Sequence, residues 1–413
     1  MLPPVLEIYV VWHPDDRAGA RAAQQLVEHF HGTLFTGLIG GAIEVYVRCQ
    51  GWRWAQDAPR PIPFPDSPPP NGVAQAHYVA VVPVLGVGLA RAVQPGAGPW
   101  FDYVTALTRA QETSARRVRV FPLLLADSAA LINTTLDRIL GIYQRLRGSL
   151  PATGDEPDTG WRRDLVQGLA QFTGGAGCRL RVFISHTRQA VDDGQTPGDL
   201  IQTVRTVIAD TSLAEFFDPR DLQAGEEWRE VLRENAGRGA LLALRTDLYA
   251  SRSWCQWEVL AAKEEGAPVV ILDALELGEE RGSFLMDHVP RIPVRRSERG
   301  WSGRDVEAGL AVLVDECLKR SLWQRQRELA FGRPDLDVVW WAPHAPEPLT
   351  LLRWLVQQRD TGALAGTGPL RILHPDPPLG LPERLVLEQL ARLGGVTRDL
   401  DVMTPRLLAA RGG

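Results

Sequence analysis

The segment RLRVFISH, residues 179–186, opens the stretch that decides the fold, and this stretch runs to Asp273. RLRVFISH is typical of a short apolar strand that runs into a polar loop, the usual place of a ligand site in an open α/β sheet. A second strand ends in FFDPRDLQAG, residues 216–225, where proline and glycine punctuate a charged loop. GALLAL, residues 239–244, predicts a third strand.

A helix is predicted after the third strand, beginning with the segment WCQWE at residues 254–258 and capped by Ser253. Trp254 and Glu258 lie four residues apart, which places them one turn apart on one helix face. A single helical glutamate is usually a solvated or salt-bridged surface group. Aromatic neighbours favour a binding role instead, because they desolvate the carboxylate and offer a stacking face for a flat ring.

The composition is that of an ordinary globular protein. The chain has 413 residues, of which 45% are hydrophobic and 23% charged, and this length suits two or three domains of about 150 residues each. A net charge of -5 gives no electrostatic reason to expect nucleic acid as a partner.

The four cysteines are far apart and form no CxxC pair: Cys49, Cys178, Cys255 and Cys317. We therefore expect neither a metal site nor a disulfide framework, and a reducing cytosol is the simpler environment. The amino terminus lacks a basic flank followed by an apolar run, and no stretch approaches the ~20 apolar residues that span a bilayer. The sequence predicts a cytoplasmic protein without a membrane segment.

Four blocks occur in the order and spacing of a known family: FISH at 183–186, DPRDLQAG at 218–225, LYAS at 248–251 and WCQWE at 254–258. Together they resemble a Toll/interleukin-1 receptor (TIR) domain of the bacterial, NAD-cleaving type. The resemblance covers Cys178 to Arg295, about a third of the chain. It implies a flavodoxin-like TIR domain over residues 178–300, with a mainly parallel five-stranded sheet.

The resemblance also implies site residues. In TIR domains that cleave NAD, catalysis depends on the glutamate of the W-C-x-x-E block, and Glu258 stands at that position. Arg188 suits the pyrophosphate because a guanidinium makes a bidentate, permanently charged contact. Gln223 stands where several relatives have a second acid, so a mechanism with two acids is not expected. The substrate-binding residues implied are Phe183, Ser185, Thr187, Arg188, Asp218, Gln223, Gly225 and Trp254.

The implied activity is that of an NAD+ nucleosidase, a hydrolase that releases nicotinamide and forms ADP-ribose or cyclic ADP-ribose. NAD is then the substrate, and no cofactor or metal is expected. TIR domains of this kind act after self-association, as triggered effectors of bacterial antiviral defence or signalling, so an activating partner or ligand of unknown identity is expected. The alternative is a non-catalytic adaptor that recruits other TIR proteins.

The flanking segments are also predicted to be α/β. Residues 1–150 alternate strands (6–12, 42–47, 78–85, 118–125) with helices (18–30, 103–113, 131–146), which implies a parallel sheet covered on both faces. Residues 151–177 read as a linker around a short helix, and 301–330 as a connecting helix. Residues 331–413 predict a small unit with strands at 336–341, 370–374 and 399–403 and helices at 348–357 and 382–393.

An internal repeat is the last sequence feature. Setting 8–12 against 181–185 and 98–104 against 252–258 aligns Trp100 with Trp254 and puts Val104 in the place of Glu258. Residues 1–150 are then either a degenerate TIR-like unit that serves sensing, scaffolding or assembly, or an α/β domain similar by topology alone.

Overall fold

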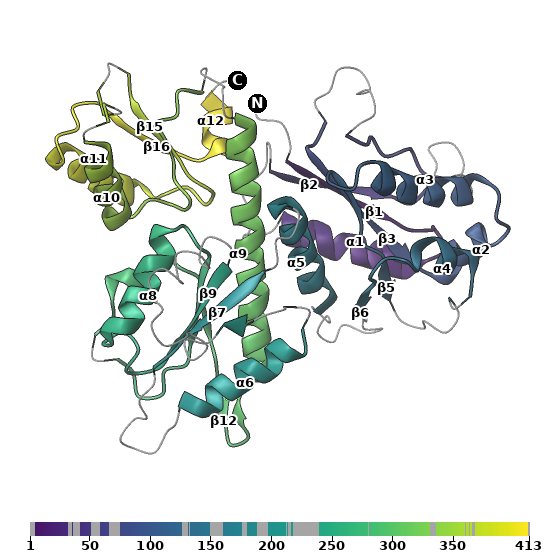
Figure 1. The fold of residues 1–413 in the computed structure, drawn as a ribbon, viewed down its shortest axis with the longest axis horizontal. Helices are drawn as coiled ribbons and strands as arrows, with labels where there is room; N and C mark the ends of the chain where they lie inside the picture. The colour runs from purple at the N-terminus through teal and green to yellow at the C-terminus, as the bar shows by residue number, and fades with distance from the viewer. Residues whose placement is uncertain are drawn as a thin grey trace, which may run out of the picture. The chain divides into compact units, whose positions relative to one another are not determined.

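The computed structural model describes residues 5–31, 35, 42–50, 58–65, 75–125, 131, 133–148, 160–175, 180–187, 197–211, 213, 216–217, 239–279, 281–330, 336–359, 361–362, 364–365 and 368–411. The fold is α/β (Figure 1). The chain divides into two compact units. The first comprises 1–176, 322–332 and 405–413, and the second 177–321 and 333–404. Within the described residues, no helix has both the length and the apolar character needed to cross a bilayer.

A parallel sheet forms the centre of the first unit. Its strands are β1 (Leu6–Val11), β2 (Ile43–Arg48), β3 (Tyr78–Leu85), β4 (Val118–Val120), β5 (Leu123–Leu125) and β6 (Leu146–Gly148). Their order is β2-β1-β3-β5-β6, with β4 beside β3, and every pairing is parallel. All residues of β1 and β3 are buried, as expected for strands that helices cover on both faces.

Helices cover this sheet. Tyr9, Val11, Val79 and Val81, which alternate along β1 and β3, pack in one core cluster with α2 (Val87–Val93), α3 (Pro99–Thr113) and α4 (Thr135–Leu140). The remaining helices of the unit include α1 (Arg17–Phe30), α5 (Gly160–Gly174) and α12 (Pro405–Arg411).

Two predictions for the first segment are corrected. The helix expected over 131–146 is only the short α4, because Asn133 has a positive φ of 63° and the Thr134 side chain caps the helix by accepting from the Asp137 N–H. Leu146–Gly148 pairs instead with β5 as an edge strand. The strand expected over 118–125 is interrupted at Pro122, which has no N–H to donate to a neighbouring strand.

The expected domain boundaries also differ from the compact units. Within the expected linker 151–177, α5 is a packed helix of the first unit: Trp161 is fully buried and the Phe172 ring meets the Tyr78 ring edge-on at 5.1 Å. The expected connecting helix is α9 (Gly303–Ala330), whose residues up to Ser321 belong to the second unit. Residues 333–404 group with the central segment rather than standing alone.

The central sheet of the second unit confirms the prediction of five parallel strands. They are β7 (Arg181–Ser185), β8 (Phe216–Phe217), β9 (Gly239–Arg245), β10 (Val269–Asp273) and β11 (Arg291–Pro293), in the order β11-β10-β9-β7-β8. All four pairings are parallel. α6 (Pro197–Ala209) lies between β7 and β8 in the sequence, and the short strands β12 (Arg296–Ser297) and β13 (Gly300–Trp301) form an antiparallel pair.

One face of the central sheet packs against α8 (Ser253–Glu264) and the 3₁₀ helix η4 (Phe284–Met286), where Leu241, Ala243 and Ile271 share a core cluster with Val259 and Met286. α9 packs close to β10 at Gly309, where an added Cβ would lie only 2.2 Å from Leu272 Cδ2. Glycine therefore permits the close approach of α9 to the sheet.

The last part of the second unit is a three-stranded parallel sheet of β14 (Trp340–Trp341), β15 (Leu370–Leu373) and β16 (Leu400–Met403). α10 (Pro348–Gln358) and α11 (Leu381–Leu393) complete the predicted alternation, and both contribute to its core cluster. The Trp340 ring stacks on that of Trp354 at 4.9 Å. The predicted strand 336–341 is confirmed only at its last two residues.

Candidate functional site

The candidate site lies where the strand order of the central sheet reverses. β7 and β9 are neighbours, β8 follows β7 on one side, and β10 and β11 follow β9 on the other. Connections diverge at such a point, and the crevice outside the carboxyl ends of the two strands is where open α/β sheets bind ligands. Ser185 is the last residue of β7, and Tyr249 follows the end of β9 by four residues.

Three side chains meet at this point. Ser185 Oγ donates to Glu258 Oε2, and it also lies 2.5 Å from the Tyr249 hydroxyl. Ser185 and Tyr249 are fully buried, and Glu258 is 1% exposed. A serine hydroxyl carries a single proton. The single proton of Ser185 is used in the hydrogen bond to the Glu258 carboxylate, so Tyr249 must be the donor in its hydrogen bond with Ser185. The hydrogen bonds therefore run in one direction, from Tyr249 through Ser185 to Glu258.

The groups around Glu258 remain protonated near neutral pH. Burial raises the pKa of Tyr249 well above its ordinary value, and the nearby Cys255 and Glu258 raise it further. Burial, followed by the charge of Glu258, raises the pKa of the Cys255 thiol to about 12. Cys255 is 2% exposed, so this thiol packs in the core and has none of the thiolate character of a nucleophile.

The structure gives different surroundings to the other predicted site residues. Phe183 is half-buried and packs against the core cluster beneath α8. Thr187 is buried, with its Oγ1 3.3 Å from Thr246 Oγ1, so the loops after β7 and β9 touch. Trp254 is 37% exposed although it lies one turn from the buried Glu258. Arg188, Asp218, Gln223 and Gly225 lie outside the described residues.

The predicted cap of α8 is corrected. Ser253 is the first residue of the helix rather than its cap, and Arg252 precedes it without a capping side-chain hydrogen bond. Gln256 Nε2 instead donates to the Ala250 carbonyl over 2.7 Å, which ties the first turn of α8 to the preceding loop.

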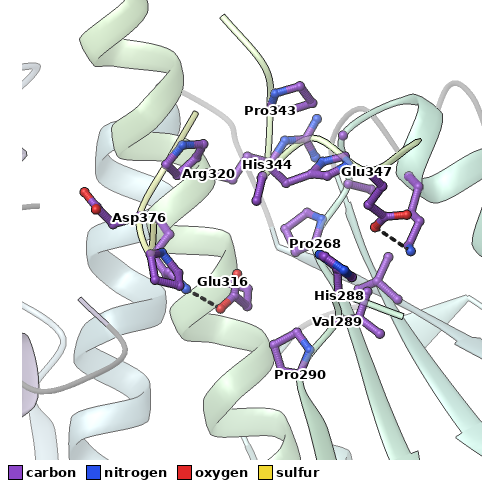
Figure 2. Close-up of a pocket in the computed structure, with 18 residues that line it drawn as sticks. Pro268, His288, Val289, Pro290, Glu316, Arg320, Pro343, His344, Glu347 and Asp376 are labelled. Carbon is purple, nitrogen blue, oxygen red and sulfur yellow. Dashed lines mark hydrogen bonds and ion pairs between the residues drawn. The ribbon is translucent and has the colours of Figure 1, made fainter. Parts of the chain in front are cut away.

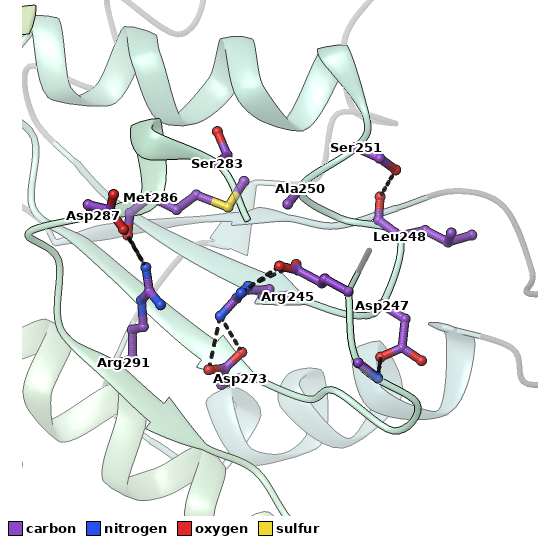
Figure 3. Close-up of polar contacts among 12 residues, drawn as sticks. Arg245, Asp247, Leu248, Ala250, Ser251, Asp273, Ser283, Met286, Asp287 and Arg291 are labelled. Atoms are coloured by element: carbon purple, nitrogen blue, oxygen red, sulfur yellow. Dashed lines mark hydrogen bonds and ion pairs between the residues drawn. The ribbon is translucent and has the colours of Figure 1, made fainter. Parts of the chain in front are cut away.

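Sequence reasoning missed the role of Tyr249. It also missed an ion-pair network around Arg245 (Figure 3). Arg245, the last residue of β9, donates to both oxygens of Asp273 over 3.0 and 3.1 Å and to Glu279 over 2.9 Å. Asp247 accepts the backbone N–H groups of residues 276–278 over 2.9–3.1 Å. The signal was present in the sequence, since Arg245 and Asp273 each end an apolar strand, but their pairing required the strand order.

A separate cavity of about 310 Å³ lies at the amino-terminal ends of strands β10 and β11 of the central sheet (Figure 2). Its walls include residues just before β10 and β11 together with residues that follow β14 and β15, among them Pro268, Pro290, Pro343 and Pro377. Its two lysines are paired, Lys263 with Glu347 and Lys319 with Glu316. These pairings leave little local charge from the lysines to select an anion.

No group of three or more His, Cys, Asp or Glu side chains arranged to hold a metal ion occurs among the residues described. A scan against models of protein families finds no match to this chain, and a search of curated protein sequences finds none either.

Proposed function

We propose that residues 178–300 form a flavodoxin-like TIR domain that hydrolyses NAD+, releasing nicotinamide, with Glu258 as the catalytic carboxylate. The observation that carries this proposal is the place of Glu258. It belongs to the WCQWE block, and its carboxylate is bonded to the last residue of β7 at the reversal point of a sheet with the order β8-β7-β9-β10-β11. In chain order this is 2-1-3-4-5, the flavodoxin-like arrangement, whose ligands bind at this reversal point.

The chemistry suits one carboxylate. The bond between ribose C1′ and the pyridinium nitrogen breaks, and the electron pair leaves with nicotinamide, which departs neutral and needs no proton. The ribose develops the positive charge of an oxocarbenium ion. A fixed carboxylate stabilises this charge electrostatically, most strongly where water is scarce. Water then adds to C1′ and loses one proton, giving ADP-ribose; attack by adenine N1 of the same molecule gives the cyclic product instead.

The burial of Glu258 supports a triggered enzyme. A substrate reaches a carboxylate that is 1% exposed only after its surroundings have opened. Such an enzyme is silent at rest, and association of TIR domains or binding of a partner supplies the change. We propose on this basis a triggered effector in bacterial antiviral defence or signalling. Phe183, Trp254, Thr187, Arg188, Asp218, Gln223 and Gly225 remain proposed substrate-binding residues.

The first unit supports a scaffolding role in the same proposal. If β4 and β5 are counted as one interrupted strand, its sheet also has the order 2-1-3-4-5. Val104 is the sixth residue of α3, as Glu258 is the sixth of α8, and it is fully buried in the apolar core. A carboxylate is therefore missing from the corresponding place, which suits sensing or assembly better than catalysis.

The same burial favours a second candidate function, a TIR adaptor that recruits other TIR proteins without turning over NAD. In that case the carboxylate of Glu258 serves only to join β7, α8 and the loop after β9 through Ser185 and Tyr249. The two functions differ in a single measurable respect, the release of nicotinamide.

The experiment compares nicotinamide release by wild type and Glu258→Gln at high protein concentration with a crowding agent. Gln keeps the size of the side chain and removes its charge, so we expect a fall of about 10²-fold or more in rate. Glu264→Gln is the matched control, since Glu264 is an exposed residue of the same helix; its activity should equal that of wild type. Equal turnover by Glu258→Gln would refute the site. No turnover by wild type, with retained binding to other TIR domains, would replace the enzyme by the adaptor.

A further inference from the structure

We propose that Ser185 and Tyr249 are positioning residues for Glu258: the hydrogen-bond chain from the Tyr249 phenol through Ser185 Oγ fixes the carboxylate and holds it ionised. This inference rests on the proposed function, and it changes the part assigned to Ser185. The sequence implied a contact between Ser185 and the substrate, whereas the fully buried hydroxyl is engaged with Glu258 and Tyr249.

The three residues come from three separate elements. Ser185 ends β7, Tyr249 belongs to the loop after β9, and Glu258 lies on α8. The rigid β7–β9 ladder, in which Ser185 pairs with Ala243, sets the position of the serine. Tyr249 is itself held by packing, because its ring lies in the core cluster with Cys255 and Val259. The carboxylate is thus oriented by groups whose own positions are fixed.

This arrangement has a chemical consequence. Glu258 Oε2 accepts the hydrogen bond from Ser185, which restricts rotation of the carboxylate about its last bond. We assign the other oxygen, Oε1, to the stabilisation of the positive charge that develops on the ribose. A donor to a carboxylate favours the ionised form. Tyr249 strengthens that donor, because a hydroxyl that accepts a hydrogen bond becomes a better donor in turn.

The titratable groups that face the carboxylate allow a clean pH test. They include the Cys255 thiol from α8 and the Tyr249 phenol from the loop after β9, and both of these groups have raised pKa values. Both stay neutral throughout the acid range. An acid limb in the pH–rate profile therefore reports the protonation of the carboxylate, and removal of a donor moves this limb to higher pH.

The test uses Tyr249→Phe, Ser185→Ala and the double variant. Tyr249→Phe keeps the buried ring, and we expect kcat to fall about 10-fold with little change in KM. Ser185→Ala removes the direct donor and should lower kcat about 10²-fold. Because Tyr249 acts through Ser185, the double variant should be no slower than Ser185→Ala. The acid limb should move to higher pH in all three.

The matched control is Tyr9→Phe. Tyr9 is a buried tyrosine of the first unit whose hydroxyl donates to Glu7 over 2.8 Å, so this variant loses the same kind of contact in another sheet. Its kcat and pH profile should equal those of wild type. An active wild type with an unchanged kcat and acid limb in Tyr249→Phe would overturn the inference and leave the proposed function standing.

A second measurement separates the two failures. If wild type releases no nicotinamide under any activating condition, the proposed function fails, and the carbon-13 resonance of the Glu258 carboxyl group decides the chain. Its pH midpoint should move upward in Ser185→Ala and in Tyr249→Phe and stay constant in Tyr9→Phe. A midpoint that is the same in all four proteins would overturn the positioning role independently of catalysis.

Discussion

Lys263 on α8 donates from Nζ to Glu347 Oε1 over 2.8 Å, and both side chains are buried. Glu347 is also the N-cap of α10, where its side chain accepts the backbone N–H of Thr350. Lys263 Nζ makes a second bond to the Asp287 carbonyl over 2.6 Å. The Glu347 carboxylate therefore caps α10 and also forms an ion pair with a buried lysine of α8, and both contacts lie within the second unit.

Removing one member of this pair should destabilise the second unit. Lys263→Met leaves Glu347 buried without its cation, and we expect a loss of about 3 kcal/mol. Lys263→Met with Glu347→Gln should recover much of the loss, because Gln is uncharged and still caps α10. Calorimetric unfolding checks this, with Arg392→Met as the control: its pair with Glu388 is 67% exposed on the Arg392 side, so the change should be below about 1 kcal/mol. Equal effects at Lys263 and Arg392 would contradict the expectation.

Two histidines should make the second unit sensitive to acid. Burial is the main cause that lowers the pKa of both His344 and His374 to about 4; for His344, nearby Lys263 and His374 contribute to this lowering. The Nδ1–H of His374 donates to the Pro375 carbonyl over 2.7 Å. In the unfolded chain both titrate near 6.5. The folded state thus binds fewer protons between pH 6.5 and 4, so stability is full above 6.5 and falls as the pH drops through this window.

The expected loss is up to about 3 kcal/mol per histidine between pH 7 and pH 4. His344→Asn and His374→Asn should flatten the dependence of the unfolding midpoint on pH, each by about half. Urea unfolding from pH 7.5 to 4.5 provides the measurement. A midpoint in the variants that falls as steeply as in wild type would show that other groups control the acid sensitivity.

Arg245 should stabilise the carboxyl edge of the central sheet through its geometry as well as its charge. Its guanidinium contacts Asp273 and Glu279 together, and the Glu279 side chain is only 5% exposed. Arg245→Met leaves two carboxylates side by side and should cost about 3 kcal/mol. Arg245→Lys keeps the charge but loses the bidentate contact, so it should lie between Met and wild type. Arg296→Met, which removes a more exposed pair with Glu276, should change the unfolding midpoint least.

Activity should depend on assembly if the proposed function holds. Opening of the site around Glu258 then requires neighbouring TIR domains, and the specific rate of nicotinamide release should rise with protein concentration and with a crowding agent. Initial rates over a hundredfold range of concentration test this, with sedimentation on the same samples. A specific rate that is constant over the whole range would indicate a self-sufficient monomer.

The amino-acid sequence by itself determined most elements of the fold. Buried parallel strands are nearly continuous apolar runs, so segments such as GALLALR in β9 and VVILD in β10 identify themselves locally. Helices α10 and α11 were predicted to within one residue because their apolar positions recur at helical spacing. The strand at Leu146–Gly148 was missed because three residues beside an edge carry no periodic signal of their own.

Only the tertiary structure decided which side chains meet. Ser185 and Tyr249 are 64 residues apart in the chain, and Lys263 and Glu347 are 84 apart. Such pairs depend on which strands are neighbours and on which face each helix packs, and neither is encoded in the local pattern. The sequence singled out Glu258 as a carboxylate beside tryptophans, whereas its burial and its hydrogen bond to β7 follow from the packing of α8 over the ends of β7 and β9. A non-local contact forms only after the chain has closed the intervening loop, so its existence is a property of the fold rather than of either segment.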